Sequence, residues 1–280
     1  MFIPIVFFNG EFLPETQAVI PISDRGFLFG EGIFTTLRVY QGRIECLSRH
    51  LDRLQRHCNV LKIKYPKIPI SIFPELIEKN HASTGCWRLK MIITGGEPNK
   101  VDYDSLRAHG QLLITLNPYQ EQNTTYHLTI YPEPIVRPCS QIKSLSYLDR
   151  FLFADYAKNR HFDDALTYDS NGFILETAFS NVFWRLGNQL IIPDFSLPYL
   201  KGITLQLAIE SANSMGMSTL YAKTKFDHIP RQSQMFLCNS LKGIKPIIGI
   251  DGLSFARDQS WEHSFLQCYN QIVLRESYSS

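Results

Sequence analysis

Short β-rich runs that end at tight-turn dipeptides constrain the fold of this chain more than any other feature. Residues 3–8 are almost all apolar and stop at Asn9-Gly10, which favours a two-residue hairpin turn before residues 11–13. Residues 34–40 form a second β-rich run, which stops at Gln41-Gly42. Hairpins connect antiparallel strands, whereas a parallel sheet needs a crossover between consecutive strands. The sequence therefore predicts a mixed α/β fold that is α+β-like, without a regular β-α-β alternation.

Helical periodicity separates these runs. From Leu47 onward, apolar residues recur every three or four positions. Four later segments also show helical patterns, at 73–80, 147–160, 204–215 and 260–275. Further strand-like runs cover 87–94, 111–117, 125–131, 164–168, 173–177, 181–185 and 234–238.

A polar stretch over residues 118–124 is predicted to link two domains, because it contains a proline and lacks periodicity. The chain has 280 residues, of which 44% are hydrophobic, so it can bury one large or two medium cores. We therefore expect a small N-terminal α/β domain over 1–117 and a larger C-terminal domain over 125–280.

Charge and cysteine usage exclude several classes of protein. The net charge of +2 argues against a nucleic-acid binder, which usually has a clustered basic face. The six cysteines include no Cys-x-x-Cys pair, which argues against a zinc site or a disulfide framework. The first residues lack the basic region and cleavage site of a signal peptide, and no apolar stretch is long enough to cross a bilayer. We expect a cytoplasmic protein with reduced thiols.

Two ionisable residues stand in distinctive surroundings. Lys143 follows the turn-prone Pro138-Cys139-Ser140 and has apolar neighbours, and Glu176 opens a stretch of small and polar residues that reaches Asn181. By spacing alone, each is more simply interpreted as a solvated surface charge. Two further features suit an anion: Gly202-Ile203-Thr204 opens a helix, and Asn239-Ser240 lies in a turn after a strand.

The sequence around these residues resembles that of the fold-type IV pyridoxal-phosphate enzymes, also called the class IV aminotransferase family. The resemblance rests on Lys143 with its neighbours, on the Glu-x-x-x-Ser-Asn-hydrophobic-Phe pattern over 176–183, and on residues 24–34, which are similar to the family's N-terminal signature. This family includes branched-chain and D-amino-acid aminotransferases and aminodeoxychorismate lyase. The resemblance covers nearly the whole chain. It implies a two-domain, D-amino-acid aminotransferase-like architecture, a pyridoxal 5′-phosphate cofactor, a small-molecule substrate and a homodimer.

The resemblance also implies roles for individual residues. Lys143 would form the Schiff base with the cofactor, and Glu176 would protonate the pyridine nitrogen so that the ring can accept electrons. Tyr147 matches a position that can hydrogen-bond the ring hydroxyl, and the small polar stretch with Ser180 and Asn181 suits close approach to a flat cofactor. Positions that contact the phosphate in the family match Arg53, Ile203, Thr204 and Ser240.

Within the family, the Phe34-Thr35-Thr36 motif is similar to the sequence of aminodeoxychorismate lyase. Aminotransferases commonly carry a glutamate after that phenylalanine. Residues 181–185 and 238–241 are also similar to the lyase. The implied reaction eliminates pyruvate from 4-amino-4-deoxychorismate to give 4-aminobenzoate for folate synthesis, with the Thr36 hydroxyl assisting the leaving group.

Two departures leave alternatives open. The glycine- and arginine-rich loop of lyase relatives is absent at 94–100, so Lys100, Arg107 or Lys242 would have to bind a substrate carboxylate. Tyr147 is more typical of the aminotransferases. A D-amino-acid or branched-chain aminotransferase is therefore the main alternative, and a non-catalytic binding protein on the same scaffold is a third.

Overall fold

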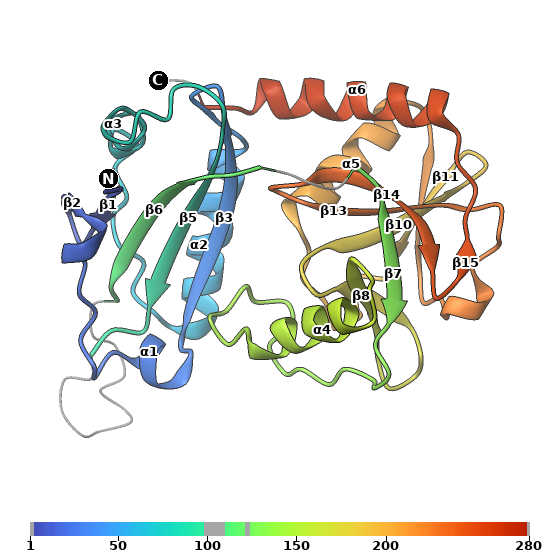
Figure 1. Cartoon of the computed structure of the whole chain (residues 1–280), viewed down its shortest axis with the longest axis horizontal. Coiled ribbons are helices and arrows are strands. Elements are labelled where there is room, and N and C mark those ends of the chain that lie inside the picture. Colours follow the sequence, from blue (N-terminus) through green and yellow to red (C-terminus); the bar gives the residue numbers. More distant parts are fainter. Residues whose placement is uncertain (1–2, 98–109, 121–123, 279–280) are drawn as a thin grey trace. The chain divides into compact units, whose positions relative to one another are not determined.

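The computed structural model describes residues 3–97, 110–120 and 124–278. The chain divides into two compact units, each built around its own sheet (Figure 1). The first unit contains Met1–Gln120, Ile142–Tyr147 and Glu276–Ser280, and the second contains Glu121–Gln141 and Leu148–Arg275. The main crossing between units falls inside the expected linker, but Ile142–Tyr147, with Lys143, groups with the first unit instead of the C-terminal part of the chain.

The sheet of the first unit has six strands, all paired antiparallel, in the order β2-β1-β6-β5-β3-β4. Asn9 and Gly10 both have positive φ, of 51° and 106°, as the expected hairpin turn between β1 and β2 requires. The strands are β1 Ile5–Phe8, β2 Glu11–Pro14, β3 Gly32–Tyr40, β4 Arg43–Ile44, β5 Cys86–Thr94 and β6 Leu112–Pro118.

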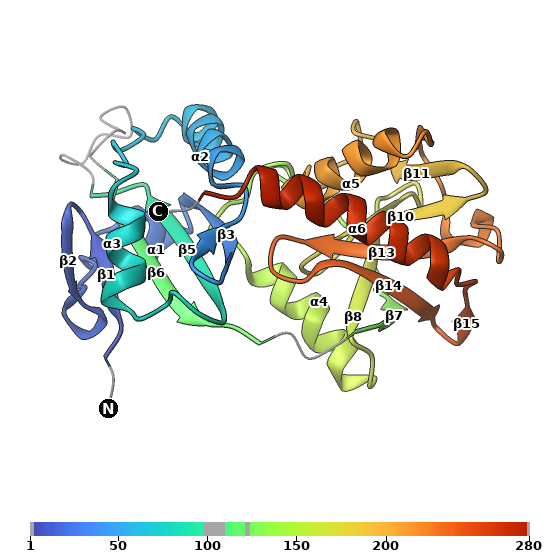
Figure 2. The same cartoon turned by 90° about the horizontal axis from the view of Figure 1, so that it is seen from above.

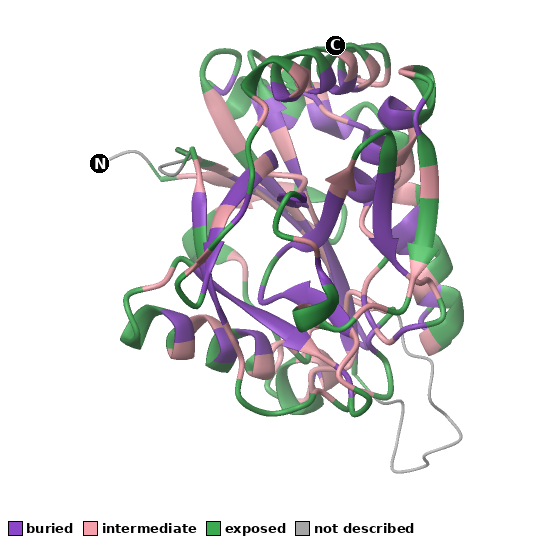
Figure 3. Ribbon diagram, turned by 90° about the vertical axis from the view of Figure 1, so that its right-hand side faces the viewer, coloured by how far each residue is buried: buried purple, intermediate pink, exposed green. Residues whose placement is uncertain are grey.

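Two helices cover one face of this sheet, α2 (Leu47–Leu61) and α3 (Ile72–Lys79). Alternate residues of the strands, such as Leu37 and Leu89, belong to the same buried core as the apolar stripes of both helices. Figure 3 shows such buried stretches in strands of the molecule. The short helices α1 (Arg25–Phe29) and η1 (Glu15–Gln17) lie between β2 and β3 in the sequence.

The segment around Lys143 extends this sheet at the edge of β3. Phe34 N donates to Lys143 O at 2.9 Å, and Leu145 N donates to Gly32 O at 2.9 Å. A Cβ on Gly32 would lie 2.7 Å from the backbone oxygen of Ile93 on the neighbouring strand β5, so only glycine fits at this position. The backbone that carries Lys143 is thus fixed by hydrogen bonds to the first unit.

The second unit contains nine strands, in the path β12-β11-β10-β13-β14-β7-β8-β9 with β15 paired to β14. A pairing between β9 and β10, through Glu176 and Asn181, closes the part of this path from β10 to β9 into a ring. The strands are β7 Tyr126–Ile130, β8 Asp164–Tyr168, β9 Ile174–Thr177, β10 Asn181–Leu186, β11 Gln189–Pro193, β12 Ser218–Ala222, β13 Gln234–Asn239, β14 Gly243–Ile250 and β15 Leu253–Ser254.

Three helices and a 3-10 turn complete the second unit: α4 (Leu148–Asn159), α5 (Ile203–Ser214), α6 (Gln259–Arg275) and η2 (Phe226–His228). Helices α5 and α6 lie side by side (Figure 2). None of the helices in the described parts of the chain is long and apolar enough to cross a membrane.

Every helix and strand expected from the periodicity is present, with ends shifted by a few residues. The strands β11, β12, β14 and β15 were not predicted, nor was α1. Residues 121–123 of the expected linker lie outside the described residues.

Candidate functional site

The candidate residues fall into two groups, one in each unit. In the first unit, the amine of Lys143 is half-buried against aromatic side chains. Its Nζ lies 3.2 Å from the hydroxyl of Tyr147 and 4.4 Å from the ring centroid of Phe34. The rings of Phe34 and Tyr147 pack edge to face, with centroids 5.0 Å apart. The structure therefore brings Lys143 and Tyr147 together, with the amine in surroundings that are only partly solvated.

A histidine on α2 holds the backbone of the same lysine. His57 Nδ1 accepts a hydrogen bond from Lys143 N at 3.2 Å, so this ring nitrogen carries no proton. Burial, together with the positive charges of Arg53, Arg56 and Lys143, lowers the pKa of His57 to about 4. The imidazole is thus neutral near pH 7 and available as an acceptor. Nothing in the sequence pattern identified His57.

Arg53 lies in a buried cluster between α2 and β3. Its Nη2 donates to Thr35 Oγ1 at 2.6 Å, and this hydroxyl is 2.6 Å from His50 Nδ1. Because Thr35 accepts from the guanidinium, it can donate its own proton to His50. Burial and the charges of Arg53 and Lys143 lower the pKa of His50, which keeps this ring neutral.

The charge of Arg53 has no carboxylate partner among the residues that the structure describes, and its Nε is buried there without a hydrogen-bond acceptor. Burial is the largest cause that lowers the pKa of Arg53, to about 10, and this value still leaves the group charged at neutral pH. A buried cation without a counter-ion is costly, so this position suits a bound anion such as a phosphate group.

Thr36 follows Thr35 on β3 and therefore faces the other side of the sheet, where the neighbouring strand β5 contributes a second amine. Thr36 pairs with Lys90 of β5, and Lys90 Nζ lies 4.7 Å from the ring centroid of Phe34. Burial and the neighbouring Arg88 lower the pKa of Lys90. The ring of Phe34 therefore contacts two amines of one unit, Lys90 and Lys143. The sequence analysis did not identify Lys90 as a site residue. The alternation of side chains between the two faces of paired strands could have placed it beside Thr36.

In the second unit, Glu176 lies on β9 with only 5% of its surface exposed. Its Oε1 accepts hydrogen bonds from Arg150 Nη2 and, at 3.3 Å, from Leu200 N. Glu176 is therefore a buried, ion-paired carboxylate, and the interpretation of it as a solvated surface charge is wrong. The partner Arg150 was not predicted.

The turn after Glu176 is held by a buried aspartate. Asp164 accepts hydrogen bonds from Thr177 Oγ1 at 2.7 Å and from Ala178 N at 3.0 Å. Burial raises the pKa of Asp164. Ser180 is buried in this turn, and Asn239 Nδ2 donates to its hydroxyl at 3.1 Å. The turns that carry Ser180 and Ser240 are thus connected through Asn239.

The N-terminus of α5 lies against Asn181. A Cβ on Gly202 would come 2.0 Å from Asn181 Oδ1, so only glycine fits at this N-cap position. Asn181 Nδ2 donates to Leu200 O at 2.7 Å. Ile203 and Thr204 are buried in the first turn of the helix, and no side chain caps it. Its first N–H groups and the helix dipole therefore favour an anion.

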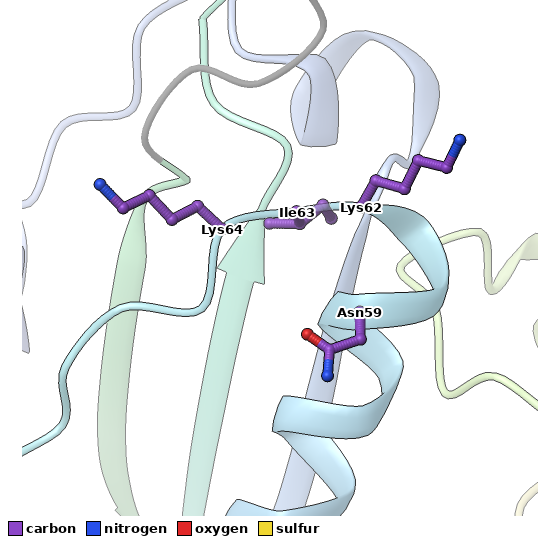
Figure 4. Close-up of a pocket in the computed structure, with 4 residues that line it drawn as sticks. All are labelled: Asn59, Lys62, Ile63 and Lys64. Carbon is purple, nitrogen blue, oxygen red and sulfur yellow. The ribbon is translucent and has the colours of Figure 1, made fainter.

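An open hollow at the end of α2 is lined by Asn59, Lys62, Ile63 and Lys64. The amines of Lys62 and Lys64 point away from one another (Figure 4), so they do not converge on one ligand. None of the candidate residues lines this hollow. Three residues were considered in the sequence as partners for a substrate carboxylate. Lys100 and Arg107 lie outside the described residues, and Lys242 Nζ lies 4.5 Å from the ring centroid of Tyr126.

Known proteins resemble the chain over nearly its whole length. An aminodeoxychorismate lyase of Bacillus subtilis is 27% identical, over 94% of this chain and 92% of that protein. A putative branched-chain-amino-acid aminotransferase of Methanocaldococcus jannaschii is 26% identical, over 88% of each. The crystal structure of a branched-chain aminotransferase from Thermoproteus uzoniensis matches with a TM-score of 0.88 at 20% identity, covering 98% of this chain and 96% of that one.

This structural match confirms the expected fold-type IV architecture. The family model described as amino-transferase class IV matches residues 32–250, which is more than half of the chain. The protein therefore belongs to the class IV aminotransferase family.

Proposed function

We propose that the chain is a pyridoxal-phosphate-dependent aminodeoxychorismate lyase, which releases pyruvate from 4-amino-4-deoxychorismate and forms 4-aminobenzoate for folate biosynthesis. The observation that carries the proposal is the arrangement on β3. The strand that places Phe34 against the amine of Lys143 also pairs Thr36 with Lys90, whose amine lies 4.7 Å from the ring centroid of Phe34. An elimination of this kind needs a base, a donor for the ether oxygen and a cation for a carboxylate, and these residues supply all three.

The cofactor is pyridoxal 5′-phosphate, and each group of candidate residues suits a part of it. Lys143 supplies the amine that binds its aldehyde. The buried charge of Arg53 and the uncapped first turn of α5, with Ile203 and Thr204, suit its phosphate. Glu176 offers Oε2 to its ring nitrogen, because both hydrogen bonds that the carboxylate accepts within the described chain are on Oε1.

Four further residues complete the proposed set. The Tyr147 hydroxyl would bind the ring hydroxyl, Ser240 would bind the phosphate, and Ser180 and Asn181 would line the ring. When bound, the cofactor supplies an electron sink for the bond that Lys143 breaks.

The roles of the protein's own residues follow from their surroundings. The amine of Lys143, when it is free, takes the proton from the amine-bearing carbon of the substrate. Thr36 donates a hydrogen bond to the ether oxygen as the carbon–oxygen bond breaks. The leaving enolpyruvate takes up the proton that Lys143 removed, and pyruvate forms. Lys90 binds a substrate carboxylate. Loss of the proton and of the enolpyruvyl group makes the ring aromatic, and the reaction therefore needs no second amino acceptor.

Incubation with two kinds of substrate tests this proposal. The holoenzyme is expected to form 4-aminobenzoate and pyruvate from 4-amino-4-deoxychorismate without any keto acid. In a parallel reaction with D-alanine or leucine plus 2-oxoglutarate, transfer of the amino group is expected to be slow or absent. Transamination without elimination would instead identify an aminotransferase.

The aminotransferase alternative is favoured by one feature of the site. Tyr147 lies next to the lysine amine, and the sequence at this position is more typical of aminotransferases than of lyases. A non-catalytic binding protein would require that the purified chain gain no visible absorbance with pyridoxal 5′-phosphate.

We also propose that the protein is a cytoplasmic homodimer. Each unit exposes apolar side chains that a partner subunit could cover: Phe27, Leu28 and Phe29 of α1, and Leu148, Phe151 and Leu152 of α4. Light scattering at micromolar concentration is expected to give the mass of a dimer, and a monomer there would contradict this assignment.

A further inference from the structure

Arg150 makes three contacts that converge on the turn after β9. Its Nη2 contacts Glu176 Oε1, and its Nη1 donates to Thr177 O at 2.9 Å and to Ala178 O at 3.4 Å. Only 5% of the surface of Arg150 is exposed. One planar guanidinium thus connects the carboxylate of Glu176 with the backbone on its C-terminal side, which a flexible ammonium could not do in the same way.

These contacts fix which oxygen of Glu176 is available. The guanidinium and Leu200 N both bind Oε1, and among the described residues no donor binds Oε2. A carboxylate held by one oxygen cannot rotate freely, so its second oxygen keeps one direction.

Resting on the proposed function, we propose that Arg150 is a positioning residue that directs Oε2 of Glu176 toward the ring nitrogen of pyridoxal 5′-phosphate. It touches neither the ring nor the phosphate in this role and acts through Glu176 alone. Its loss removes the contribution of the ring nitrogen to cofactor binding and leaves the contribution of the phosphate.

This separation can be measured with two ligands. Pyridoxal 5′-phosphate and its 1-deaza analogue share the aldehyde and the phosphate, but the analogue has carbon in place of the ring nitrogen. Fluorescence titration of the full chain freed of cofactor gives a dissociation constant for each. The wild type is expected to prefer the natural cofactor by roughly 10- to 100-fold, the range for a hydrogen bond to a charged group.

Substitution of Arg150 then tests the inference. In Arg150→Gln, the preference is expected to fall to that of Glu176→Gln, while the affinity for the deaza analogue stays within about twofold of the wild type. Combining both substitutions is expected to reduce the preference no further, because Arg150 acts through Glu176. Arg150→Lys keeps the positive charge but loses the planar guanidinium, so it is expected to lose only part of the preference. This variant replaces Arg150→Gln in the test if the Gln variant does not fold.

The matched control is Arg257→Gln, which removes another arginine–glutamate ion pair, with Glu262, from the same unit. It is expected to leave the preference unchanged. If Arg150→Gln keeps the full preference, or weakens both ligands equally, Arg150 has only a structural role and the inference is wrong. A wild type without any preference would instead refute the role of Glu176 in the proposed function.

Discussion

The hydrogen bond between His57 and the backbone of Lys143 predicts a specific dependence of stability on pH. The pKa of His57 is lowered from 6.5 to about 4 in the folded protein. Between these values the unfolded chain binds a proton that the folded chain does not, so the free energy of unfolding falls as the pH falls. From pH 7 to pH 5 this difference amounts to roughly 2 kcal/mol, which solvent screening of the half-buried ring reduces to about 1 kcal/mol.

Replacement of the imidazole by an amide isolates this contribution. In His57→Asn, an oxygen that does not titrate can take the place of Nδ1 as the acceptor for Lys143 N. The variant is expected to match the wild type at pH 7 and to be more stable than it by about 1 kcal/mol at pH 5. Urea unfolding of both proteins at both pH values measures the difference.

Other titrating groups, His50 included, are common to both proteins and cancel in this comparison. His57→Ala, which has no acceptor, is expected to lose about 1 kcal/mol at pH 7 because Lys143 N is left without this partner. A constant difference between wild type and His57→Asn at the two pH values would refute the reasoning, since His57 would then titrate alike in the folded and unfolded chains.

Three further predictions concern the proposed site. Lys143→Ala is expected to abolish turnover and the visible absorbance of the bound cofactor while circular dichroism stays unchanged; an active variant would refute the site. Lys90→Met is expected to raise KM for the substrate at least tenfold with a smaller change in kcat, as for loss of a charged hydrogen bond, and steady-state kinetics would detect a purely structural role by an unchanged KM. Gly202→Ala is expected to weaken cofactor binding and to lower the melting temperature, since a Cβ would lie 2.0 Å from Asn181 Oδ1. Normal binding in a calorimetric titration would show that the close approach of Gly202 to Asn181 is not needed to bind the cofactor.

Local patterns in the sequence were sufficient for most of the fold. The turn at Asn9-Gly10 and the helical spacing from Leu47 are set by neighbouring residues, so they could be predicted without tertiary information. Strand β14 was missed because Gly243–Ile250 contains glycine and proline, which usually weaken a strand. Its pairing with β13 and β7 overrides that local tendency.

The candidate site was predictable only in part, because its supporting contacts join residues far apart in the sequence. The family resemblance identified Lys143 and Glu176, but their partners His57 and Arg150 stand 86 and 26 positions away. Periodicity within one helix or strand carries no information on such pairs. The pairing of the Lys143 segment with β3 depends likewise on long-range register, so the local sequence pattern could not group that segment with the first unit.

The charges within each unit explain why an anionic cofactor suits this protein. In the first unit, Arg53 is buried without a carboxylate partner among the described residues, and burial also lowers the pKa of Lys90. A buried cation without a counter-ion destabilises a fold, so a bound anion there offsets a cost that the protein alone must bear. In the second unit, Glu176 already has the guanidinium of Arg150 as its counter-ion. In the proposed role, its Oε2 would accept a hydrogen bond from the ring nitrogen. The carboxylate would not become an isolated buried charge when the cofactor leaves.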